Sequence, residues 1–385
     1  MNKKELKIAL VHDFLTQFGG AERVLLALSE IFPDAPIYTL IYDKNALGER
    51  FGSKDVRVSF LQKFPAFLKK RKKWLLPFLP VAPETFDLRD FDLVISSSGA
   101  WSKGIVTRLN TTHVSYVHSP MRFIWDMNGE YLNQRSRLGC IRFITRFILN
   151  YIRVWDRVAS DRPDLLLSNS IYTRDRIRKY YGRDSEVIYP PAFVPLSGTT
   201  VGKQGAGDIK DNYFLIVSRL SAYKKVDAAI EAFNKLELPL VVVGTGEQEK
   251  YLKSIAGKNI RFAGFVPDEK LGEIYSNARA FVFPGVDDFG IAPVEAMSYG
   301  VPVLSIRKGG MREVIVEGKT GEFFASSVPE VIADGVRRFI ENEKGYDREA
   351  IRNKANEFSK EKFKKNILEY LEKIKAANQA QKSGI

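Results

Sequence analysis

The chain has few of the residues that build disulfides and metal sites. It contains one cysteine, Cys140, and three histidines among 385 residues. A single cysteine excludes an intrachain disulfide and is most simply explained by the packing of a small side chain. No carboxylate pair has the spacing of a metal site, and no Ser-His-Asp or Cys-His signature predicts covalent acyl chemistry. We therefore expect no metal and no other cofactor.

Long apolar runs are also missing. Hydrophobic residues make up 45% of the chain, yet no apolar run is long enough to cross a bilayer. The N-terminus, MNKKELKIALVHDF, passes from charged residues directly into a short strand-like run and lacks the longer apolar region and cleavage site of a signal peptide. We expect a cytoplasmic protein.

Acidic residues are outnumbered, since 59 Lys and Arg face 46 Asp and Glu, for a formal charge of +13. An excess of this sign implies an anionic partner, which could be nucleic acid, a nucleotide or an acidic membrane face. Between Val56 and Pro83 there are seven basic residues and no acid. The densest run is Lys69, Lys70, Arg71, Lys72 and Lys73, followed at once by Trp74.

Basic residues beside Trp and Leu favour contact with an anionic membrane surface. We expect the run from Lys69 to Trp74 to make this contact, and the protein to associate peripherally with the inner face of the membrane. A nucleic-acid binder would need basic and aromatic residues along one groove, whereas the basic clusters here stand beside apolar segments. We therefore expect no nucleic-acid partner. A second basic stretch, Arg142 to Arg157, has the period of an amphipathic helix. An ordinary helix with a solvated polar face and a core face is the favoured explanation for most of its residues.

The length favours two domains. Short apolar strands alternate with helical stretches in the first half and again beyond residue 212, which predicts two doubly wound α/β domains. The expected boundaries are 1–197 and 212–357, with a Gly-rich linker at about 198–211 and a last helix from about 358 to 385. The strands are expected at Lys7 to Phe14, Pro36 to Tyr42, Val56 to Phe60, Asp92 to Ser96, His113 to His118, Asp164 to Ser168, Tyr213 to Val217, Leu240 to Val243, Arg261 to Phe265 and Ala280 to Phe283, with Val187 to Tyr189 a weaker candidate.

The segment FPGVDDFGIAPVEAMSYGVPV, Phe283 to Val303, combines acids with a glycine turn. A strand ends at Pro284, and a helical period resumes at about Pro293. The backbone N–H groups of Gly290 and Ile291 would point outward at a helix N-terminus, where a diphosphate binds well. Asp287 and Glu295 could accept hydrogen bonds from sugar hydroxyls. Alternatively, Asp287 only caps the helix and Glu295 only interacts with its dipole.

Three further segments lie where strands end. Arg219 and Lys224 share one loop in VSRLSAYKKVDAAIEAF and could together neutralise a diphosphate. Gly19 and Gly20 precede a helix and would allow close approach of a phosphate. His118 follows a parallel strand, where a histidine can hydrogen-bond a sugar hydroxyl. Each segment has an ordinary explanation as well: a solvated loop, a turn or a structural histidine. Gly244 and Gly246 form a turn that could approach a nucleotide, although the dinucleotide fingerprint is absent.

Taken together, these motifs resemble family 4 glycosyltransferases, which are retaining enzymes of the GT-B fold, with two Rossmann-like domains facing across a cleft and a last helix that crosses back to the first domain. The resemblance covers nearly the whole chain and is strongest from Val217 to Phe324, where Gly309 and Gly310 look like a further family loop. Asp287 stands where the family usually has Glu, and Lys225 stands where Gly is usual.

The resemblance implies an acceptor-binding first domain and a donor domain that binds a nucleoside diphosphate sugar. It implies catalytic roles for His118, Arg219, Lys224 and Asp287. The implied donor-binding set is Gly19, Gly20, Arg219, Lys224, Gly244, Asp287, Phe289, Gly290, Ile291 and Glu295.

The motifs look most like those of mannosyltransferases of polysaccharide and O-antigen assembly, which implies GDP-mannose as donor and a lipid-linked saccharide as acceptor. A UDP-hexose donor and a nucleotide-sugar epimerase of the same fold stay open.

Overall fold

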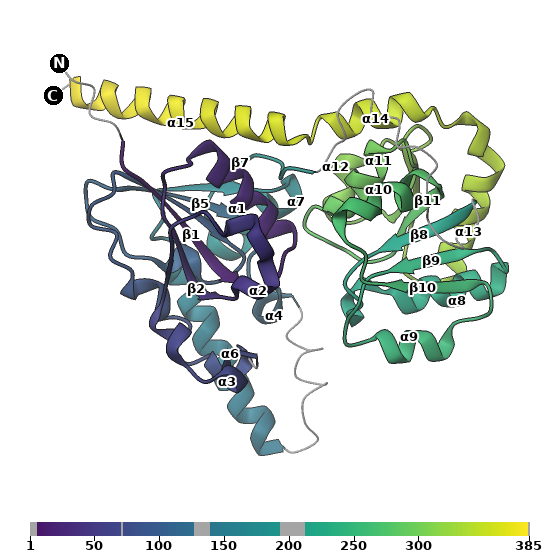
Figure 1. Cartoon of the computed structure of the whole chain (residues 1–385), viewed down its shortest axis with the longest axis horizontal. Helices are drawn as coiled ribbons and strands as arrows, with labels where there is room; N and C mark the ends of the chain where they lie inside the picture. Colours follow the sequence, from purple (N-terminus) through teal and green to yellow (C-terminus); the bar gives the residue numbers. More distant parts are fainter. Residues whose placement is uncertain (1–5, 71, 127–138, 193–211, 384–385) are drawn as a thin grey trace. The chain divides into compact units, whose positions relative to one another are not determined.

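The structure is a computed structural model that describes residues 6–70, 72–126, 139–192 and 212–383. It divides into two compact units, one formed by residues 1–189 together with 366–385 and the other by residues 190–365. The predicted linker, 198–211, lies outside the described residues. Figure 1 shows the elements of both units.

The first unit is built on a parallel seven-stranded sheet of order β3-β2-β1-β4-β5-β6-β7. Its central strands are buried on both faces, as expected for a parallel sheet covered by helices. The strands are β1 (Ile8–Leu15), β2 (Ile37–Tyr42), β3 (Val56–Val58), β4 (Leu93–Ser98), β5 (Thr112–Val117), β6 (Leu165–Ser168) and β7 (Glu186–Val187). The strand order reverses between β1 and β4, and ligands of such sheets bind beside this switch point.

The helices of the first unit begin and end at residues suited to helix termini. Ser170 accepts a hydrogen bond from the Thr173 N–H at the start of α7, and Gly182, at φ 62°, ends that helix. The α-helices are α1 (Gly20–Ile31), α2 (Lys44–Leu47), α3 (Ala66–Lys70), α4 (Arg122–Trp125), α6 (Gly139–Ala159) and α7 (Ile171–Tyr181). Short 3-10 helices are η1 (Gly48–Phe51), η2 (Phe60–Lys63), η3 (Lys72–Leu75), η4 (Ala82–Thr85) and η5 (Ser102–Gly104).

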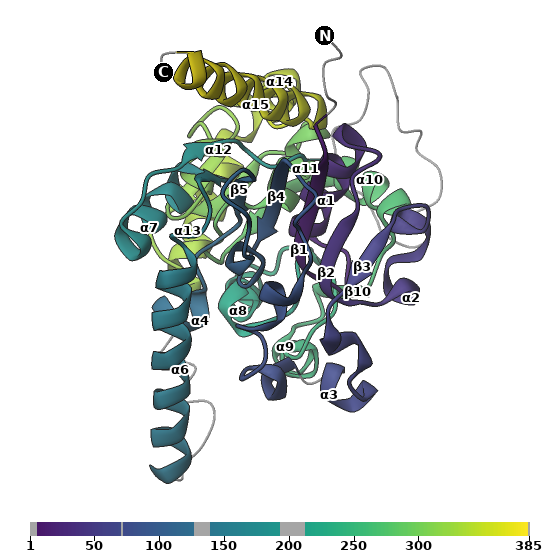
Figure 2. The same cartoon turned by 90° about the vertical axis from the view of Figure 1, so that its left-hand side faces the viewer.

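Helix α6 is held to this unit by a buried ion pair. Lys103 and Asp156 form a salt bridge in the core, and the Asp156 carboxylate also accepts hydrogen bonds from the Trp125 indole at 2.7 Å and the Tyr181 hydroxyl at 2.9 Å. A buried charge pair is tolerated when further hydrogen bonds satisfy it. Leu149 and Ile152 of α6 join the same core cluster. The helix is therefore fixed in place along its second half. Figure 2 shows α6 from the side, extending downward beyond the sheet of the first unit.

The second unit repeats the doubly wound pattern with a six-stranded parallel sheet of order β10-β9-β8-β11-β12-β13. Its strands are β8 (Tyr213–Val217), β9 (Leu240–Val243), β10 (Ile260–Gly264), β11 (Ala278–Phe283), β12 (Val303–Ile306) and β13 (Gly321–Phe324). Its helices are η6 (Ala222–Lys224), α8 (Val226–Leu236), α9 (Glu249–Ile255), α10 (Asp268–Ser276), α11 (Ile291–Ser298), α12 (Met311–Val314), α13 (Pro329–Asn342), η7 (Glu343–Gly345) and α14 (Arg348–Asn356).

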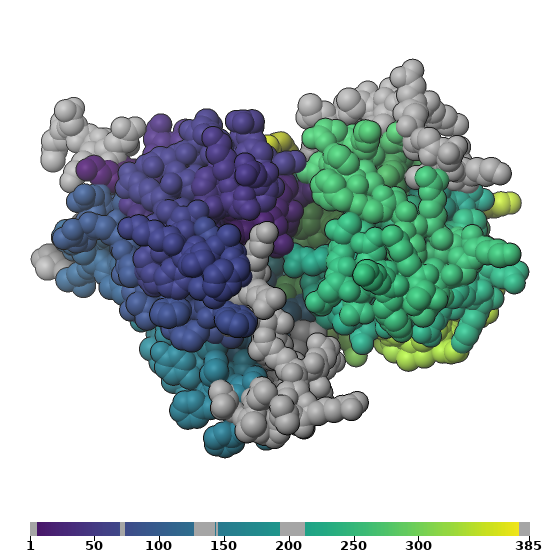
Figure 3. Space-filling model, turned by 60° about the horizontal axis from the view of Figure 1, so that its bottom comes forward, coloured from purple at the N-terminus to yellow at the C-terminus, as the bar shows by residue number. Residues whose placement is uncertain are grey.

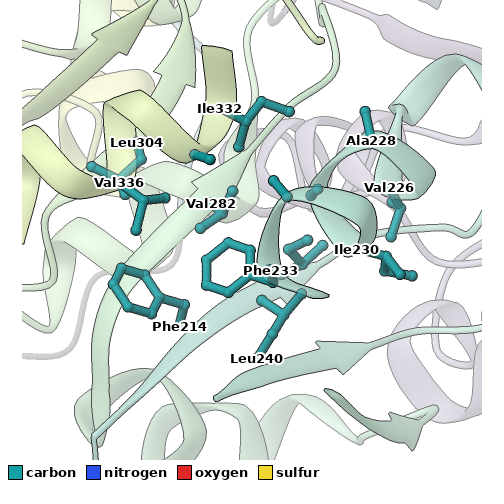
Figure 4. Packing of buried hydrophobic residues seen from close by; sticks show 14 of the residues in the cluster. Phe214, Val226, Ala228, Ile230, Phe233, Leu240, Val282, Leu304, Ile332 and Val336 are labelled. Atoms are coloured by element: carbon teal, nitrogen blue, oxygen red, sulfur yellow. The ribbon is translucent and has the colours of Figure 1, made fainter. Parts of the chain in front are cut away.

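The core of the second unit lies between the sheet and the helices α8 and α13. Phe214 packs edge-on against Phe233 of α8 and Phe339 of α13, with ring centroids 5.0 and 5.9 Å apart. Val282 and Leu304 from the strands, and Ile332 and Val336 from α13, complete the cluster in Figure 4. These fully buried apolar side chains stabilise the sheet whose carboxyl edge carries the candidate site.

The last helix, α15 (Lys360–Ser383), begins in the second unit and continues into residues that pack with the first. Near its middle, Lys373 Nζ lies 3.6 Å from Glu186 Oε1. Within the described part of the chain, no helix is both long and apolar enough to cross a membrane. The predicted class, two doubly wound α/β domains, is confirmed. The strands β12 and β13 were not predicted.

Candidate functional site

The second unit carries a cation and an acid at the switch point of its sheet, where β8 and β11 lie side by side. Lys224 ends the loop that follows β8, and Asp287 lies in the loop that follows β11. Their side chains form an ion pair with exposed fractions of 14% and 21%. The Lys224 ammonium also lies 5.5 Å from the centroid of the Phe283 ring. Lys224 and Asp287, which the sequence analysis identified in separate motifs, are thus in direct contact.

Glycines hold the loop of Lys224 in place because neighbouring backbone lies where a side chain would be. A Cβ on Gly285 would come within 2.8 Å of the Lys224 carbonyl oxygen. A Cβ on Gly244, at φ +125°, would lie 1.9 Å from the Ser218 carbonyl oxygen, and one on Gly246 would lie 2.2 Å from that of Leu220. Gly244 and Gly246 therefore have a packing role beneath the loop, which explains them without a ligand.

Arg219 differs from Lys224 in its surroundings. It follows β8, its side chain is exposed, and within the described residues it has no carboxylate partner. Its loop is nevertheless held by the backbone, since the Leu220 N–H donates to Thr245 O at 3.0 Å and Leu220 O accepts from the Gln248 N–H at 3.0 Å. The structure thus places an uncommitted guanidinium on a fixed loop at the carboxyl edge of the sheet.

Helix α11 begins at Ile291, earlier than the Pro293 that the sequence predicted. Proline is tolerated there because the first-turn N–H groups have no partner inside the helix. Gly290 is the N-cap, at φ +95°, and no side chain caps the helix. The alternative in which Asp287 only caps this helix is therefore wrong. Glu295 lies beyond the first turn, so its expected position at the helix N-terminus is wrong too.

The loop from Asp287 to Gly290 is closely packed. Gly309 and Gly310 lie against it: a Cβ on Gly309 would come within 2.3 Å of Asp287 O, and the Gly310 N–H donates to Asp287 O at 3.1 Å. The Phe289 side chain is buried, with its ring 5.3 Å from that of Phe358. A donor could therefore meet the backbone here, but the ring of Phe289 faces the protein interior.

Glu295 is buried beneath this loop. Only 5% of its surface is exposed, and its carboxylate accepts a hydrogen bond from the Tyr275 hydroxyl at 3.3 Å. Tyr299 stacks on Tyr275 with centroids 5.7 Å apart. Burial, and then the charge of Glu295, raise the pKa of Tyr299. A buried carboxylate held by the Tyr275 hydroxyl is an oriented acceptor of hydrogen bonds.

The first unit brings together polar side chains at its own switch point. His12 of β1 pairs in register with Ser97 of β4, and its Nδ1 lies 3.1 Å from Ser97 Oγ. His118, directly after β5, places Nε2 at 2.8 Å from the same hydroxyl. Glu22 of α1 lies 3.7 Å from His12 Nε2. Ser97 thus bridges two histidines, which sequence reasoning missed; the signal was three serines in a row at the end of β4.

The protonation of this cluster follows from its surroundings. Burial, and then the charge of His12, lower the pKa of His118 to about 4, against smaller opposing effects from Asp13 and Glu22. Burial raises the pKa of Glu22, but His12 and backbone hydrogen bonds outweigh it, and the net pKa is lowered. At neutral pH His118 is therefore a neutral imidazole, and Glu22, which lies against His12, is ionised.

Gly19 and Asp13 are committed to the architecture of the first unit. The Gly19 N–H donates to Glu22 Oε2 at 2.9 Å, while Gly20 is exposed at the start of α1. Both oxygens of Asp13 accept backbone N–H groups, from Gly99, Ala100, Trp101 and Ser102, at distances between 2.6 and 2.9 Å. Asp13 therefore anchors the loop that follows β4, the strand that carries Ser97.

The predicted membrane segment is only partly described. The side chains from Lys70 to Lys73 lie outside the described residues. Trp74 exposes 61% of its surface, and Lys69 Nζ donates to Gln62 O at 3.0 Å. Among the described residues, no group of three or more His, Cys, Asp or Glu is arranged to hold a metal ion.

Comparison with known proteins places both units in related families. The family described as Glycosyltransferase Family 4 matches residues 18–192, and the family described as Glycosyl transferases group 1 matches residues 203–379.

Three relatives illustrate the range of similarity. An uncharacterized glycosyltransferase of Methanocaldococcus jannaschii is 32% identical over 163 residues, which span 40% of this chain and 41% of that protein. The α-1,3/1,6-mannosyltransferase ALG2 of Candida glabrata is 25% identical, covering 81% of this chain and 78% of its own length. A GDP-mannose-dependent α-(1-6)-phosphatidylinositol monomannoside mannosyltransferase of Mycolicibacterium smegmatis is 27% identical, over 43% of this chain and half of that protein.

Solved structures share the fold. Anabaena HepE in complex with UDP-glucose superposes with a TM-score of 0.68 at 19% identity, covering 96% of this chain and 100% of that one.

Proposed function

The chain belongs to the family 4 glycosyltransferases and has their GT-B fold, and from this we propose that it transfers mannose from GDP-mannose to a lipid-linked saccharide. The transfer would retain the anomeric configuration and would assemble a cell-surface polysaccharide or a glycolipid. Relatives described as mannosyltransferases support the sugar, and one described as GDP-mannose-dependent supports the base.

The observation that carries the proposal is the cluster at the switch point of the second sheet. Lys224 and Asp287 are paired there, Arg219 stands at the start of the loop that Lys224 ends, and α11 begins without a side-chain cap. A diphosphate needs cations and free N–H groups, and the attached sugar needs oriented acceptors. This edge of the second sheet offers both within a few residues.

In the proposed mechanism, the protein lowers the barrier mainly by stabilising the leaving group. Negative charge grows on the diphosphate as the glycosidic bond breaks, and Arg219 and Lys224 would stabilise it. Asp287 would hold the sugar hydroxyls and Glu295 the ribose. The backbone at Gly290 and Ile291 would meet the diphosphate, and the resemblance to the family gives Gly19 and Gly20 a role in donor binding as well.

His118 would hydrogen-bond the sugar near its reacting carbon. Because its imidazole is neutral at pH 7, it can donate from one nitrogen and accept at the other. The acceptor hydroxyl would attack on the face that the leaving group occupies, so no enzyme nucleophile is required. We propose that no metal takes part, since the two cations supply the positive charge that the diphosphate requires.

A lipid-linked acceptor requires the enzyme to reach a membrane, and we propose peripheral association with its inner face through the segment from Lys69 to Trp74. The dense basic run and the exposed Trp74 support this location.

A UDP-hexose is the second candidate donor, and a nucleotide-sugar epimerase is the second candidate activity. A screen of GDP- and UDP-sugars for protection against thermal unfolding separates the donors, because a ligand at about a hundred times its Kd stabilises the fold by about 2.7 kcal/mol. Protection by UDP-sugars alone would exclude GDP-mannose. Incubation of the donor without an acceptor then distinguishes the activities, since only an epimerase converts the free nucleotide sugar to its epimer.

A further inference from the structure

Helix α6 has a second apolar face that no described part of the protein covers. Its first apolar face, with Leu149 and Ile152, lies in the core. On the opposite face, large side chains recur at helical spacing and each exposes more than half of its surface. These residues, the α6 stripe, are Phe143, Phe147, Tyr151, Val154 and Val158.

An exposed line of aromatic and branched side chains on one helix marks an interaction surface, whereas apolar residues scattered singly are ordinary. The α6 stripe runs along most of a helix of 21 residues. Figure 3 shows α6 (teal) at the surface of the first unit.

The second half of the stripe, from Tyr151 to Val158, is held as a preformed surface, and the first half continues the same helix. The Asp156 carboxylate ties α6 to Lys103, Trp125 and Tyr181. The Arg153 guanidinium adds hydrogen bonds to Ile124 O at 2.8 and 3.1 Å. Docking would therefore cost little ordering of the backbone.

The charges around the stripe select the partner. The sequence of α6 contains four arginines and one acid, Asp156, and that acid is buried in its ion pair with Lys103. Arg146 is exposed beside Phe147. Arg157 is paired with Asp161 just beyond the helix, so the exposed face of α6 is apolar with its positive charge at Arg146. Such a face suits the interface of an anionic bilayer. A second copy docking on the same face would bring like charges together.

We propose that the α6 stripe rests on an anionic membrane surface, with its aromatic rings at the level of the lipid headgroups and Arg146 among the phosphates. Tyr151 suits this depth because its ring is apolar and its hydroxyl tip is polar, and the phenylalanine rings supply apolar area. The same unit exposes Phe67, Trp74 and Phe78 in its basic segment. Membrane contact thus has two anchors in place of one. The role of this contact rests on the proposed function, since it would bring the enzyme to a lipid-linked acceptor. Binding to the membrane itself requires no acceptor.

The test is co-sedimentation with vesicles of phosphatidylglycerol, and with vesicles of phosphatidylcholine, for the full chain and for the triple variant F143S/F147S/Y151S. The wild type is expected to bind the anionic vesicles, and to bind them less tightly in high salt. The triple variant is expected to lose at least about tenfold in partitioning, since binding scales with the apolar area that enters the interface. The matched control is F265S, because Phe265 exposes 76% of its surface in the second unit. It should bind as the wild type does.

Three results would overturn the inference. The first is unchanged vesicle binding by the triple variant, and the second is no binding by the wild type. The third is a wild-type dimer in solution that the triple variant converts to a monomer, which would assign the stripe to a second copy. Protection of both proteins by the donor against thermal unfolding is measured in parallel. If the triple variant loses vesicle binding but the donor still protects it against unfolding, the loss is due to the α6 stripe and not to misfolding. If the donor protects neither protein, the result contradicts the proposed function and leaves the membrane contact to be judged by the vesicle assay.

Discussion

Neutralising Asp287 separates its two proposed roles. In Asp287→Asn, Lys224 loses its ion-pair partner. The substitution also removes a negative charge that would repel a diphosphate bound on the other side of the Lys224 ammonium. Two unit charges about 7 Å apart interact by about 1.2 kcal/mol at an effective dielectric constant of about 40. The variant should therefore bind the free nucleoside diphosphate about five to ten times more tightly than the wild type.

The same variant should turn over the sugar donor more slowly. If the carboxylate accepts hydrogen bonds from the sugar hydroxyls, an amide replaces one charged acceptor with a weaker one, and kcat should fall at least about tenfold. Titration calorimetry with GDP or UDP, whichever protects the wild type, gives the affinity, and product formation gives kcat.

The control is Glu343→Gln. Glu343 forms a partly buried ion pair with Arg279, whose strand position lies at the opposite end of β11 from Asp287. Neither diphosphate affinity nor kcat should change there. If Asp287→Asn bound the diphosphate more weakly than the wild type, the ion pair would be structural and the reasoning would be refuted.

Three further changes test other parts of the structure. Lys225 occupies the left-handed region at φ 54°, so Lys225→Gly should stabilise the protein by about 0.5 to 1 kcal/mol, which denaturant unfolding measures; a destabilised variant would contradict this. Ser97→Ala removes the hydroxyl that bridges His12 and His118. It should lower kcat on the order of tenfold with little change in KM, and it should shift the pH profile of kcat. An unchanged pH profile would show that Ser97 has no positioning role. Burial lowers the pKa of His113 to about 3, so below about pH 6.5 the unfolded state binds a proton that the folded state does not. The free energy of unfolding should therefore fall by about 2 kcal/mol between pH 7 and pH 5. In His113→Phe the free energy of unfolding should depend less on pH over this range.

The fold could be predicted because apolar runs and helical periods alternate so regularly. The strands β8 and β9 were predicted with the bounds that the structure gives them. The strand β13 was missed because it begins with Gly321 and Glu322, which do not form an apolar run. The strand β12 is as short as β9, which was predicted, and nearly as apolar, so its omission has no such physical reason. Helix α11 was predicted to start late because Pro293 was taken as its first residue, although proline is tolerated throughout the first turn.

The candidate site was predictable in part. Residue types and spacing pointed to Lys224 and Asp287, and the structure pairs them; their roles toward a ligand stay predictions. The bridge through Ser97 could not be found from spacing, because it depends on the register between β1, β4 and β5. The α6 stripe escaped for a similar reason. A helix with apolar residues on most of its surface does not reveal which of them face the core, and only the packing of Leu149 and Asp156 settles that.

The most direct test of the account is a crystal structure with the donor that protects the protein against unfolding. The account predicts that the Arg219 guanidinium and the Lys224 ammonium lie within hydrogen-bonding distance of the diphosphate oxygens, with the sugar beside Asp287. A diphosphate bound elsewhere, with both cations directed into solvent, would contradict it.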